Sequence, residues 1–265
     1  MSPTVENIYL ALTREFNDGE TRAIISSGQA VVLHRLAIMS KDGDWIVREH
    51  PADLDFILTV LESRNARYRF GAPLDARWLA GGWSSHLEFM ADGIRVRCDF
   101  FSRPPRLSDE QLAQLWATHS GQQIPFLEIE ALLMVKQTQR EKDYAVIGEL
   151  ARKLPPEVQV LHSRSARDLI AAASETPDLV RGLESQRPLL LHALLKNRDT
   201  LEEALDKERR QLMRADENRL AAFSAASATW RTVWPALQPS LTGMPLKKAH
   251  ALILQAAEDE LPFHP

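Results

Sequence analysis

The sequence predicts an α+β protein, in which a mixed β-sheet flanked by helices is followed by an all-α C-terminal region. Short runs of β-branched and aromatic residues alternate with helical patterns as far as residue 105. Two of these runs are joined by Ala91-Asp92-Gly93, a hairpin turn signal. Beyond Pro155-Pro156 every segment has helical character. This proline pair therefore predicts a boundary between a domain at 1–155 and a helical domain at 156–265.

Bulk properties exclude several classes of protein. The chain has 265 residues and a net charge of −4, which gives no support for non-specific binding to nucleic acids or membranes. Its one cysteine, Cys98, excludes an intrachain disulfide and a cysteine-based zinc site. The sequence contains no apolar run that could span a bilayer and no secretory signal pattern at its start. We therefore expect a cytoplasmic protein.

The first part of the chain is expected to place short elements around the sheet. Strands are predicted at 23–25, 51–58, 68–70, 86–90 and 94–101. Helices are predicted at 3–16, 29–36, 60–66 and 107–119, the last with Ser108 as its N-cap. Because Lys41-Asp42-Gly43-Asp44 is a turn signal, the segment 37–50 is predicted to be a hairpin or a flexible loop. It would be inserted between the helix at 29–36 and the strand at 51–58.

The rest of the chain is predicted to be helical. Apolar residues recur at helical spacing in 126–154, and further helices are expected at 165–174, 188–195, 200–226 and 246–258. The stretch 230–245 contains three prolines and is predicted to be a connector. The helix at 200–226 has only a sparse apolar stripe, which is typical of a helix that packs on a neighbour or a partner chain.

Asp53 and Asp55 are the most conspicuous polar residues in an apolar run. In a strand their side chains would point to the same face, about 6.5 Å apart. Two carboxylates on one strand face are unfavourable unless a positive charge lies between them. A divalent metal ion is the candidate for that charge, and the pair is therefore interpreted as a metal site.

Asp99 is a third carboxylate at the centre of a predicted strand, and it shares a face with Arg95 and Arg97. Two interpretations stay open. The residue belongs either to a surface Arg–Asp pair, which is common and weak, or to a cluster with Asp53 and Asp55.

Two further groups of residues are candidates for phosphate binding. The small turn Ser26-Ser27-Gly28 precedes a predicted helix, where backbone N–H groups could face a phosphate, although such a turn is more often only a cap. Lys136, Arg140 and Asp143 follow at i, i+4 and i+7 and would share one helix face. That face is either a solvated, ion-paired surface or a pair of cations that Asp143 orients toward phosphates.

This combination resembles the nucleotidyltransferase-fold superfamily over about residues 20–155. The signature of that superfamily is a hydrophobic-Gly-Gly/Ser turn followed by Asp-hydrophobic-Asp-hydrophobic on a strand. The stretch from Lys136 to Arg140-Glu141-Lys142-Asp143 is similar to the downstream motif of its abortive-infection branch, which includes toxins of toxin–antitoxin systems.

The resemblance implies a transferase that moves a nucleoside monophosphate from an NTP to a hydroxyl of an RNA, a protein or a small molecule, with Mg²⁺ as its cofactor. It also implies a tRNA or a protein as the acceptor, and an antitoxin as a partner. The residue roles that it implies are phosphate contacts by Ser27 and Gly28, metal binding by Asp53 and Asp55, nucleotide binding by Lys136 and Arg140, and a place for Asp143 in the same pocket. Asp99 would be the third carboxylate, which either binds a second metal ion or deprotonates the acceptor.

An alternative is a catalytically inactive interaction module on the same fold. The turn is Ser-Ser-Gly instead of Gly-Gly or Gly-Ser, and Gly28 is far from Asp53 in the sequence. Arg95 and Arg97 could also neutralise Asp99. Such a module would associate with a partner or with itself through the C-terminal helices.

Overall fold

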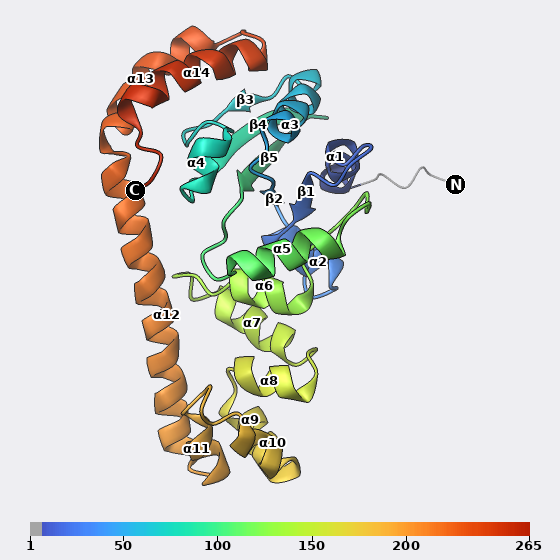
Figure 1. Ribbon diagram of the computed structural model, residues 1–265, viewed down its shortest axis with the longest axis vertical. Helices are drawn as coiled ribbons and strands as arrows, with labels where there is room; N and C mark the ends of the chain where they lie inside the picture. Colours follow the sequence, from blue (N-terminus) through green and yellow to red (C-terminus); the bar gives the residue numbers. More distant parts are fainter. Residues whose placement is uncertain (1–6) are drawn as a thin grey trace. The chain divides into compact units, whose positions relative to one another are not determined.

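A five-stranded mixed sheet forms the centre of the N-terminal part of the protein. The computed structural model describes residues 7–265 (Figure 1), so the start of the predicted helix at 3–16 lies outside the described residues. The strand order is β1-β2-β5-β4-β3, and β2 and β5 are parallel while the other neighbours are antiparallel. The strands are β1 (Ala23–Ile25), β2 (Asp42–Val47), β3 (Arg67–Tyr68), β4 (Ser85–Ala91) and β5 (Ile94–Phe101).

Contacts divide the chain into two compact units. The first contains residues 1–127 and 221–265, and the second contains residues 128–220. The division does not coincide with Pro155-Pro156, because α8 begins at Pro156 within the second unit. The predicted class is confirmed: a mixed sheet flanked by helices precedes a chain that is helical from residue 129 onward.

The helices of the first unit flank the sheet, and most of them alternate with its strands in the sequence. Phe16 of α1 packs edge-on against Trp45 of β2 and Phe100 of β5, and these two rings stack on each other with centroids 5.4 Å apart. All three side chains are fully buried. This aromatic cluster buries one face of the two parallel strands. The helices of this unit before residue 128 are α1 (Ile8–Phe16), α2 (Ser27–Leu33), α3 (Pro51–Ser63), α4 (Ala76–Ala80) and α5 (Asp109–Thr118).

The C-terminal segment completes the first unit through buried tryptophans. Trp78 and Trp83 donate from Nε1 to the carbonyls of Leu261 and Pro262, both at 3.0 Å. Trp230 of α13 (Ala228–Leu241) donates to the carbonyl of Gly71 at 2.9 Å. The end of the chain, including α14 (Leu246–Glu260), therefore belongs to the same core as the sheet.

The second unit is a helical bundle with its own core. Its helices are α6 (Ile129–Val135), α7 (Asp143–Ala151), α8 (Pro156–His162), α9 (Ala166–Glu175), α10 (Pro177–Gly182) and α11 (Leu190–Leu194). The helix α12 (Arg198–Ala226) contributes residues to both units. Leu169, Val180, Leu190 and Leu201 form the centre of the bundle core.

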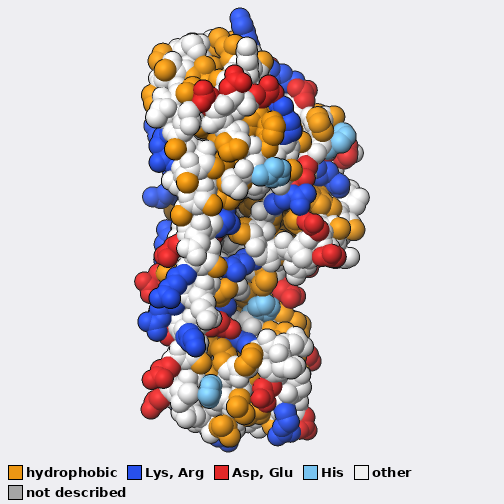
Figure 2. Space-filling model, turned by 60° about the vertical axis from the view of Figure 1, so that its left-hand side comes forward, with side chains coloured by type: hydrophobic (Ala, Val, Ile, Leu, Met, Phe, Trp, Pro, Cys, Tyr) orange, Lys and Arg blue, Asp and Glu red, His pale blue; other side chains and the backbone are white. Residues whose placement is uncertain are grey.

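The surface of α12 is rich in ion pairs within one helix. Arg198 pairs with Glu202 at 2.7 Å, and Arg210 pairs with Asp206 at 2.5 Å. On the face drawn in Figure 2, acidic and basic side chains are interspersed. Within residues 7–265 no helix combines the length and apolar character that crossing a membrane requires.

Three predicted elements are wrong, and each has a physical reason. Residues 51–58 do not form a strand but begin α3, which Pro51 starts at a position that favours proline. The segment 37–50 is not an inserted loop, because it contains β2. The stretch 230–245 is largely α13 despite two internal prolines, since burial of Trp230 and Trp234 outweighs their cost.

Candidate functional site

The polar face of the sheet carries two rows of charged side chains. Because paired strand residues share a face, the register places Asp44, Asp99 and His86 in one row. The second row contains Asp42, Arg97, Glu88 and Arg67. The opposite face of the same strands is the aromatic core, so the two rows lie on the side of the sheet away from that core.

Asp42 and Asp44 are paired carboxylates on one strand face, which is the arrangement predicted for Asp53 and Asp55. They alternate with Gly43 and Trp45, which point toward the core. A Cβ on Gly43 would overlap the Trp45 ring and would lie 2.6 Å from Cδ1 of Tyr9. Glycine between the two aspartates thus lets the Trp45 ring close the core beneath them.

The small turn predicted for phosphate binding lies next to this aspartate pair. The backbone N–H of Ser26 donates to the carbonyl of Asp44 at 2.8 Å. Ser40 Oγ donates to the carbonyl of Asp42 at 3.2 Å, and a Cβ on Gly28 would lie 3.0 Å from Cβ of Ser40. Ser27 has φ +46°, in the left-handed region that non-glycine residues rarely adopt. The turn and the Asp42-Gly43-Asp44 strand therefore form one structural feature.

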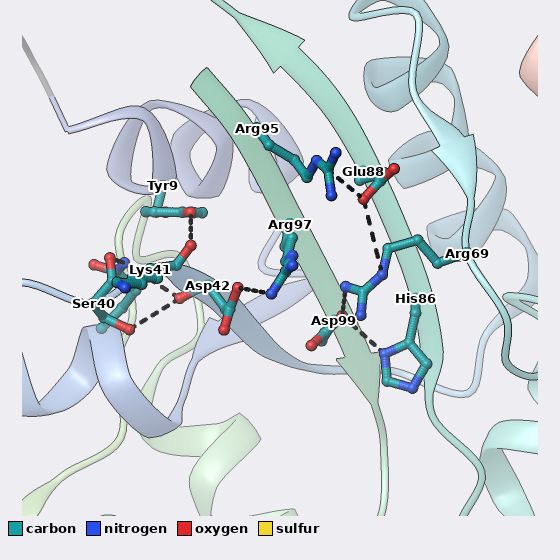
Figure 3. A network of polar contacts seen from close by, with 11 residues as sticks. Tyr9, Ser40, Lys41, Asp42, Arg69, His86, Glu88, Arg95, Arg97 and Asp99 are labelled. Atoms are coloured by element: carbon teal, nitrogen blue, oxygen red, sulfur yellow. Dashed lines mark hydrogen bonds and ion pairs between the residues drawn. The ribbon is translucent and has the colours of Figure 1, made fainter. Parts of the chain in front are cut away.

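One carboxylate oxygen of Asp42 lacks a hydrogen-bond partner. Oδ1 is buried, and Nη1 of Arg97 lies 3.5 Å from it, without the geometry of a hydrogen bond (Figure 3). An unsatisfied buried carboxylate oxygen is unfavourable. Asp42 could therefore accept a further cation or donor.

Two side chains contact the carboxylate of Asp99. Its Oδ1 lies 2.8 Å from Nδ1 of His86 and 3.4 Å from Nη1 of Arg69 (Figure 3). Arg95 and Arg97, the neighbours predicted to neutralise it, instead contact Glu88 and Asp42 at 3.9 and 3.5 Å. Asp99 is thus paired, but with His86 of the neighbouring strand β4 and with Arg69, the residue after β3.

Glu88 is surrounded by three arginines of the same face. It accepts from Nη2 of Arg67 at 2.8 Å, and Arg69 and Arg95 lie at 4.0 and 3.9 Å. Its side chain is only 11% exposed, whereas that of Arg67 is 75% exposed. The arginines therefore neutralise a largely buried glutamate, while parts of their side chains stay exposed to solvent.

The predicted metal pair Asp53 and Asp55 is not brought together. On α3 two residues at i and i+2 point about 200° apart around the axis. Asp53 is buried and lies 3.3 Å from Nε of Arg22, whereas Asp55 is exposed and pairs with Lys247 at 2.8 Å. Each carboxylate has its own cation, so the metal-site interpretation of this pair is wrong.

Lys136, Arg140 and Asp143 do meet, although not on one helix face. Lys136 ends α6, Arg140 lies in the connection, and Asp143 begins α7. Asp143 accepts from Nζ of Lys136 at 3.3 Å and from Nε of Arg140 at 2.8 Å. Lys136 and Asp143 are both buried. Burial raises the pKa of Asp143, but Arg140 and Lys136 outweigh it and hold that pKa below its usual range. This cluster belongs to the second unit.

The sequence contains a strand signal next to Asp42 and Asp44, but the turn signal of Asp42-Gly43 conceals it. Trp45, Ile46 and Val47 are strong strand formers directly after the Asp-Gly-Asp sequence. Extending the strand backward over those residues places both aspartates on one face. The contacts of Asp99 with His86 and Arg69 carry no comparable signal, because they depend on the strand order.

Comparison with known proteins gives limited similarity. No family model matches the sequence, and no curated protein matches it. Two crystal structures from Helicobacter pylori are similar over most of the chain: JHP933, with a TM-score of 0.39, 12% identity and coverage of 82% of this chain and 94% of that one, and a "putative nucleotidyltransferase from H. pylori", with a TM-score of 0.38, 12% identity and coverage of 79% and 94%.

Proposed function

We propose that this protein is a metal-dependent nucleotidyltransferase whose metal-binding carboxylates are Asp42 and Asp44. The observation that carries the proposal is their position on one face of β2, hydrogen-bonded through the backbone to the Ser26-Ser27-Gly28 turn. The order of turn, helix and acidic strand is the signature that the sequence resembles. With Asp42 in place of Asp53, the segment 37–50 supplies the signature strand itself and is no longer an insertion.

The residues present fit a magnesium ion. Mg²⁺ is commonly bound through one or two carboxylates, with waters and substrate phosphates as the other ligands. The unsatisfied Oδ1 of Asp42 is available for such a bond. Across residues 7–265 no three His, Cys, Asp or Glu side chains gather into a metal-binding group. The proposed site therefore has two protein carboxylates and requires the nucleotide to complete it.

The chemistry follows from this arrangement. A bound divalent ion would supply charge neutralisation for the phosphates of the nucleotide. Asp42 and Asp44 would hold the nucleotide through that ion, and Ser27 and Gly28 would offer backbone N–H groups from the adjoining turn. The acceptor hydroxyl would then attack the α-phosphorus in line, and pyrophosphate would leave.

The finer assignments stay predictions from the resemblance. They include the metal role of Asp99, nucleotide binding by Lys136 and Arg140, and the contribution of Asp143. They also include a toxin–antitoxin role, with a tRNA or a protein as acceptor and an antitoxin as partner. Expression of the protein should arrest growth if the toxin role is correct, and Asp44→Asn should relieve that arrest.

The test is a transfer assay with α-³²P-labelled NTPs, Mg²⁺ and three acceptors: total tRNA, the protein itself and a small polyol. We expect the wild-type protein to label one of them, and EDTA to abolish the labelling. Asp44→Asn should lower the rate at least about 100-fold, because the metal loses one of its two carboxylates. Asp55→Asn is the matched control and should transfer at the wild-type rate. Unchanged transfer by Asp44→Asn would refute the proposal.

A second candidate function is an inactive binding module, which the position of Arg97 beside Asp42 favours. A cation already supplied by the protein would make a metal unnecessary. Isothermal titration of the wild-type protein with each NTP and Mg²⁺ distinguishes the two functions. The module should give no binding signal, whereas the transferase should bind a nucleotide and lose that binding in Asp44→Asn.

A further inference from the structure

His86 and Asp99 form an oriented histidine–carboxylate pair beside the proposed metal site. Nδ1 of His86 donates to Oδ1 of Asp99 at 2.8 Å, and the carboxylate also accepts from Arg69. When Nδ1 carries the proton, Nε2 of a neutral imidazole is an acceptor. A carboxylate that holds Nδ1 of a histidine orients the ring so that Nε2 can accept a proton, which is the arrangement of a general base.

The surroundings of the ring restrict its orientation. A Cβ on Gly71 would lie 2.7 Å from Cδ2 of His86, so the ring packs directly against the glycine backbone. The carbonyl of Gly71 is itself held by Nε1 of Trp230 at 2.9 Å. The His86 side chain is 30% exposed. The imidazole is therefore fixed on its Nδ1 and Cδ2 sides while part of it still faces solvent.

His86 occupies the same row of the sheet as Asp44. Asp99 stands between them, in register with both, and neighbouring strands lie about 4.8 Å apart. His86 therefore lies on the same face of the sheet as a nucleotide held at Asp44, two strands away.

We propose that His86 is the general base that removes the proton from the acceptor hydroxyl, and that Asp99 is the positioning residue that orients it. This inference rests on the proposed nucleotidyltransferase function. It assigns Asp99 to the histidine and leaves metal binding to Asp42 and Asp44.

Proton transfer to His86 accompanies the attack of the acceptor on the nucleotide. The acceptor hydroxyl gives its proton to Nε2 of His86 while its oxygen forms a bond to the α-phosphorus. The bond from that phosphorus to the oxygen bridging the α- and β-phosphates breaks, and pyrophosphate leaves with the electron pair. The imidazolium is stabilised by Asp99 and returns its proton to water.

The kinetic test uses His86→Asn in the single-turnover form of the transfer assay. The Asn amide can still donate to Asp99 from the position of Nδ1, but it cannot accept a proton. We expect its rate to fall about 100-fold or more. Added imidazole should partly restore the rate of His86→Gly.

His50, an exposed histidine of the same unit, gives the control His50→Asn, which should keep the wild-type rate. A His86→Asn rate within threefold of wild type, or a His86→Gly rate that imidazole does not raise, would overturn the inference. If Asp44→Asn loses transfer and His86→Asn does not, the assignment of His86 alone is wrong. If Asp44→Asn keeps transfer, or the wild type has none, the proposed function itself is wrong.

A second measurement needs no acceptor. Long-range ¹⁵N–¹H spectra of the wild-type protein at neutral pH should show His86 with its proton on Nδ1, and Asp99→Asn should alter that signal. A proton on Nε2 would contradict the proposed role, because that nitrogen could not then accept a proton.

Discussion

Asp44 on β2 lies in direct parallel register with Asp99 on β5, so two carboxylates share one face of neighbouring strands. One residue further along, Trp45 and Phe100 stack with their ring centroids 5.4 Å apart on the opposite face. A slip of β2 by one residue would exchange the two faces of that strand, so that Trp45 would point to solvent and Asp44 into the core. The aromatic core thereby determines where the acidic face forms.

Gly43 is predicted to be essential for this arrangement. In Gly43→Ala the new Cβ would overlap Trp45 and press on Tyr9, whose hydroxyl donates to the carbonyl of Lys41 at 2.6 Å. We expect the free energy of unfolding to fall by about 1–3 kcal/mol, the usual cost of overpacking. Urea unfolding measures this change.

Gly148→Ala is the matched control, because nothing lies within 4 Å of its Cβ position in α7. Alanine is the better helix former, so this variant should be as stable as wild type or slightly more stable. Equal stability losses in the two variants would contradict the role assigned to Gly43.

The sequence is sufficient to predict the class of fold but not to choose between two Asp-x-Asp motifs. The motif at 53–55 lies in an apolar run, yet Leu54, Ile57, Leu58 and Leu61 recur at helical spacing and are all buried. The motif at 42–44 contains Asp-Gly, which is a frequent turn signal. Local patterns thus favoured a pair that α3 separates, and only the strand β2 and its pairing with β5 show that Asp42 and Asp44 share one face.

The site beyond the aspartates depends on contacts that are distant in the sequence. His86 meets Asp99 because β4 and β5 are paired, and Arg69 reaches the same carboxylate from the residue after β3. Lys136 and Asp143 were expected to meet on one helix, and they meet across a break between two helices. The prediction of one shared helix face is therefore wrong, although the three residues do lie together.

Asp53→Asn is predicted to affect stability but not transfer. Asp53 is buried beside Arg22, whose Nε has no hydrogen-bond partner. Loss of the carboxylate charge removes one partner of a largely buried guanidinium, which keeps its bonds to backbone carbonyls and its contact with Glu20, so the cost should be about 1–3 kcal/mol. Chemical unfolding and the transfer assay at a temperature where the variant is folded would measure the two effects.

The control for this prediction is Asp55→Asn on the same helix. Asp55 is 65% exposed, so loss of its pair with Lys247 should cost less than about 1 kcal/mol. Loss of transfer in Asp53→Asn without loss of stability would restore Asp53 as a candidate metal ligand.

Asp143→Asn is predicted to destabilise the second unit strongly. Lys136 is 6% exposed, and its ammonium contacts the Asp143 carboxylate at 3.3 Å. Removal of one partner leaves a buried charge uncompensated, which costs about 3–5 kcal/mol. Since the pKa of Asp143 is lowered in the folded protein, its contribution is present at neutral pH and is lost as the pH falls through that lowered value.

Thermal unfolding followed by circular dichroism measures the effect of Asp143→Asn. The control Asp206→Asn removes a partly exposed carboxylate that pairs with Arg209 and Arg210 on α12, and it should change the melting temperature little. Similar melting temperatures for both variants would show that Lys136 finds another partner or is hydrated.

His162 is predicted to make the stability of the protein depend on pH between about 6.5 and 4. Burial, reinforced by the positive charges of Arg187 and Arg164, lowers its pKa to about 4, although Glu208 acts in the opposite direction. In the unfolded chain a histidine has a pKa of about 6.5. Below that value the unfolded state binds the proton that the folded state excludes, so stability is full above pH 6.5 and falls as the pH decreases toward 4. At pH 5 the loss from this one residue should be about 2 kcal/mol relative to neutral pH.

The measurement is urea unfolding at pH 7.5 and pH 5 for the wild-type protein and for His162→Gln, whose side chain does not titrate. His250, whose pKa burial also lowers to about 4, contributes equally to both proteins and cancels in the comparison. The variant should therefore lose about 2 kcal/mol less than wild type between the two pH values, even if its stability at pH 7.5 is lower.

Equal losses in the two proteins would mean that His162 accepts a proton in the folded state as readily as in the unfolded state. Glu130, 3.8 Å from Nε2 of His162, is the carboxylate that could stabilise that proton, and Glu130→Gln in the wild-type background would then separate its contribution from that of burial.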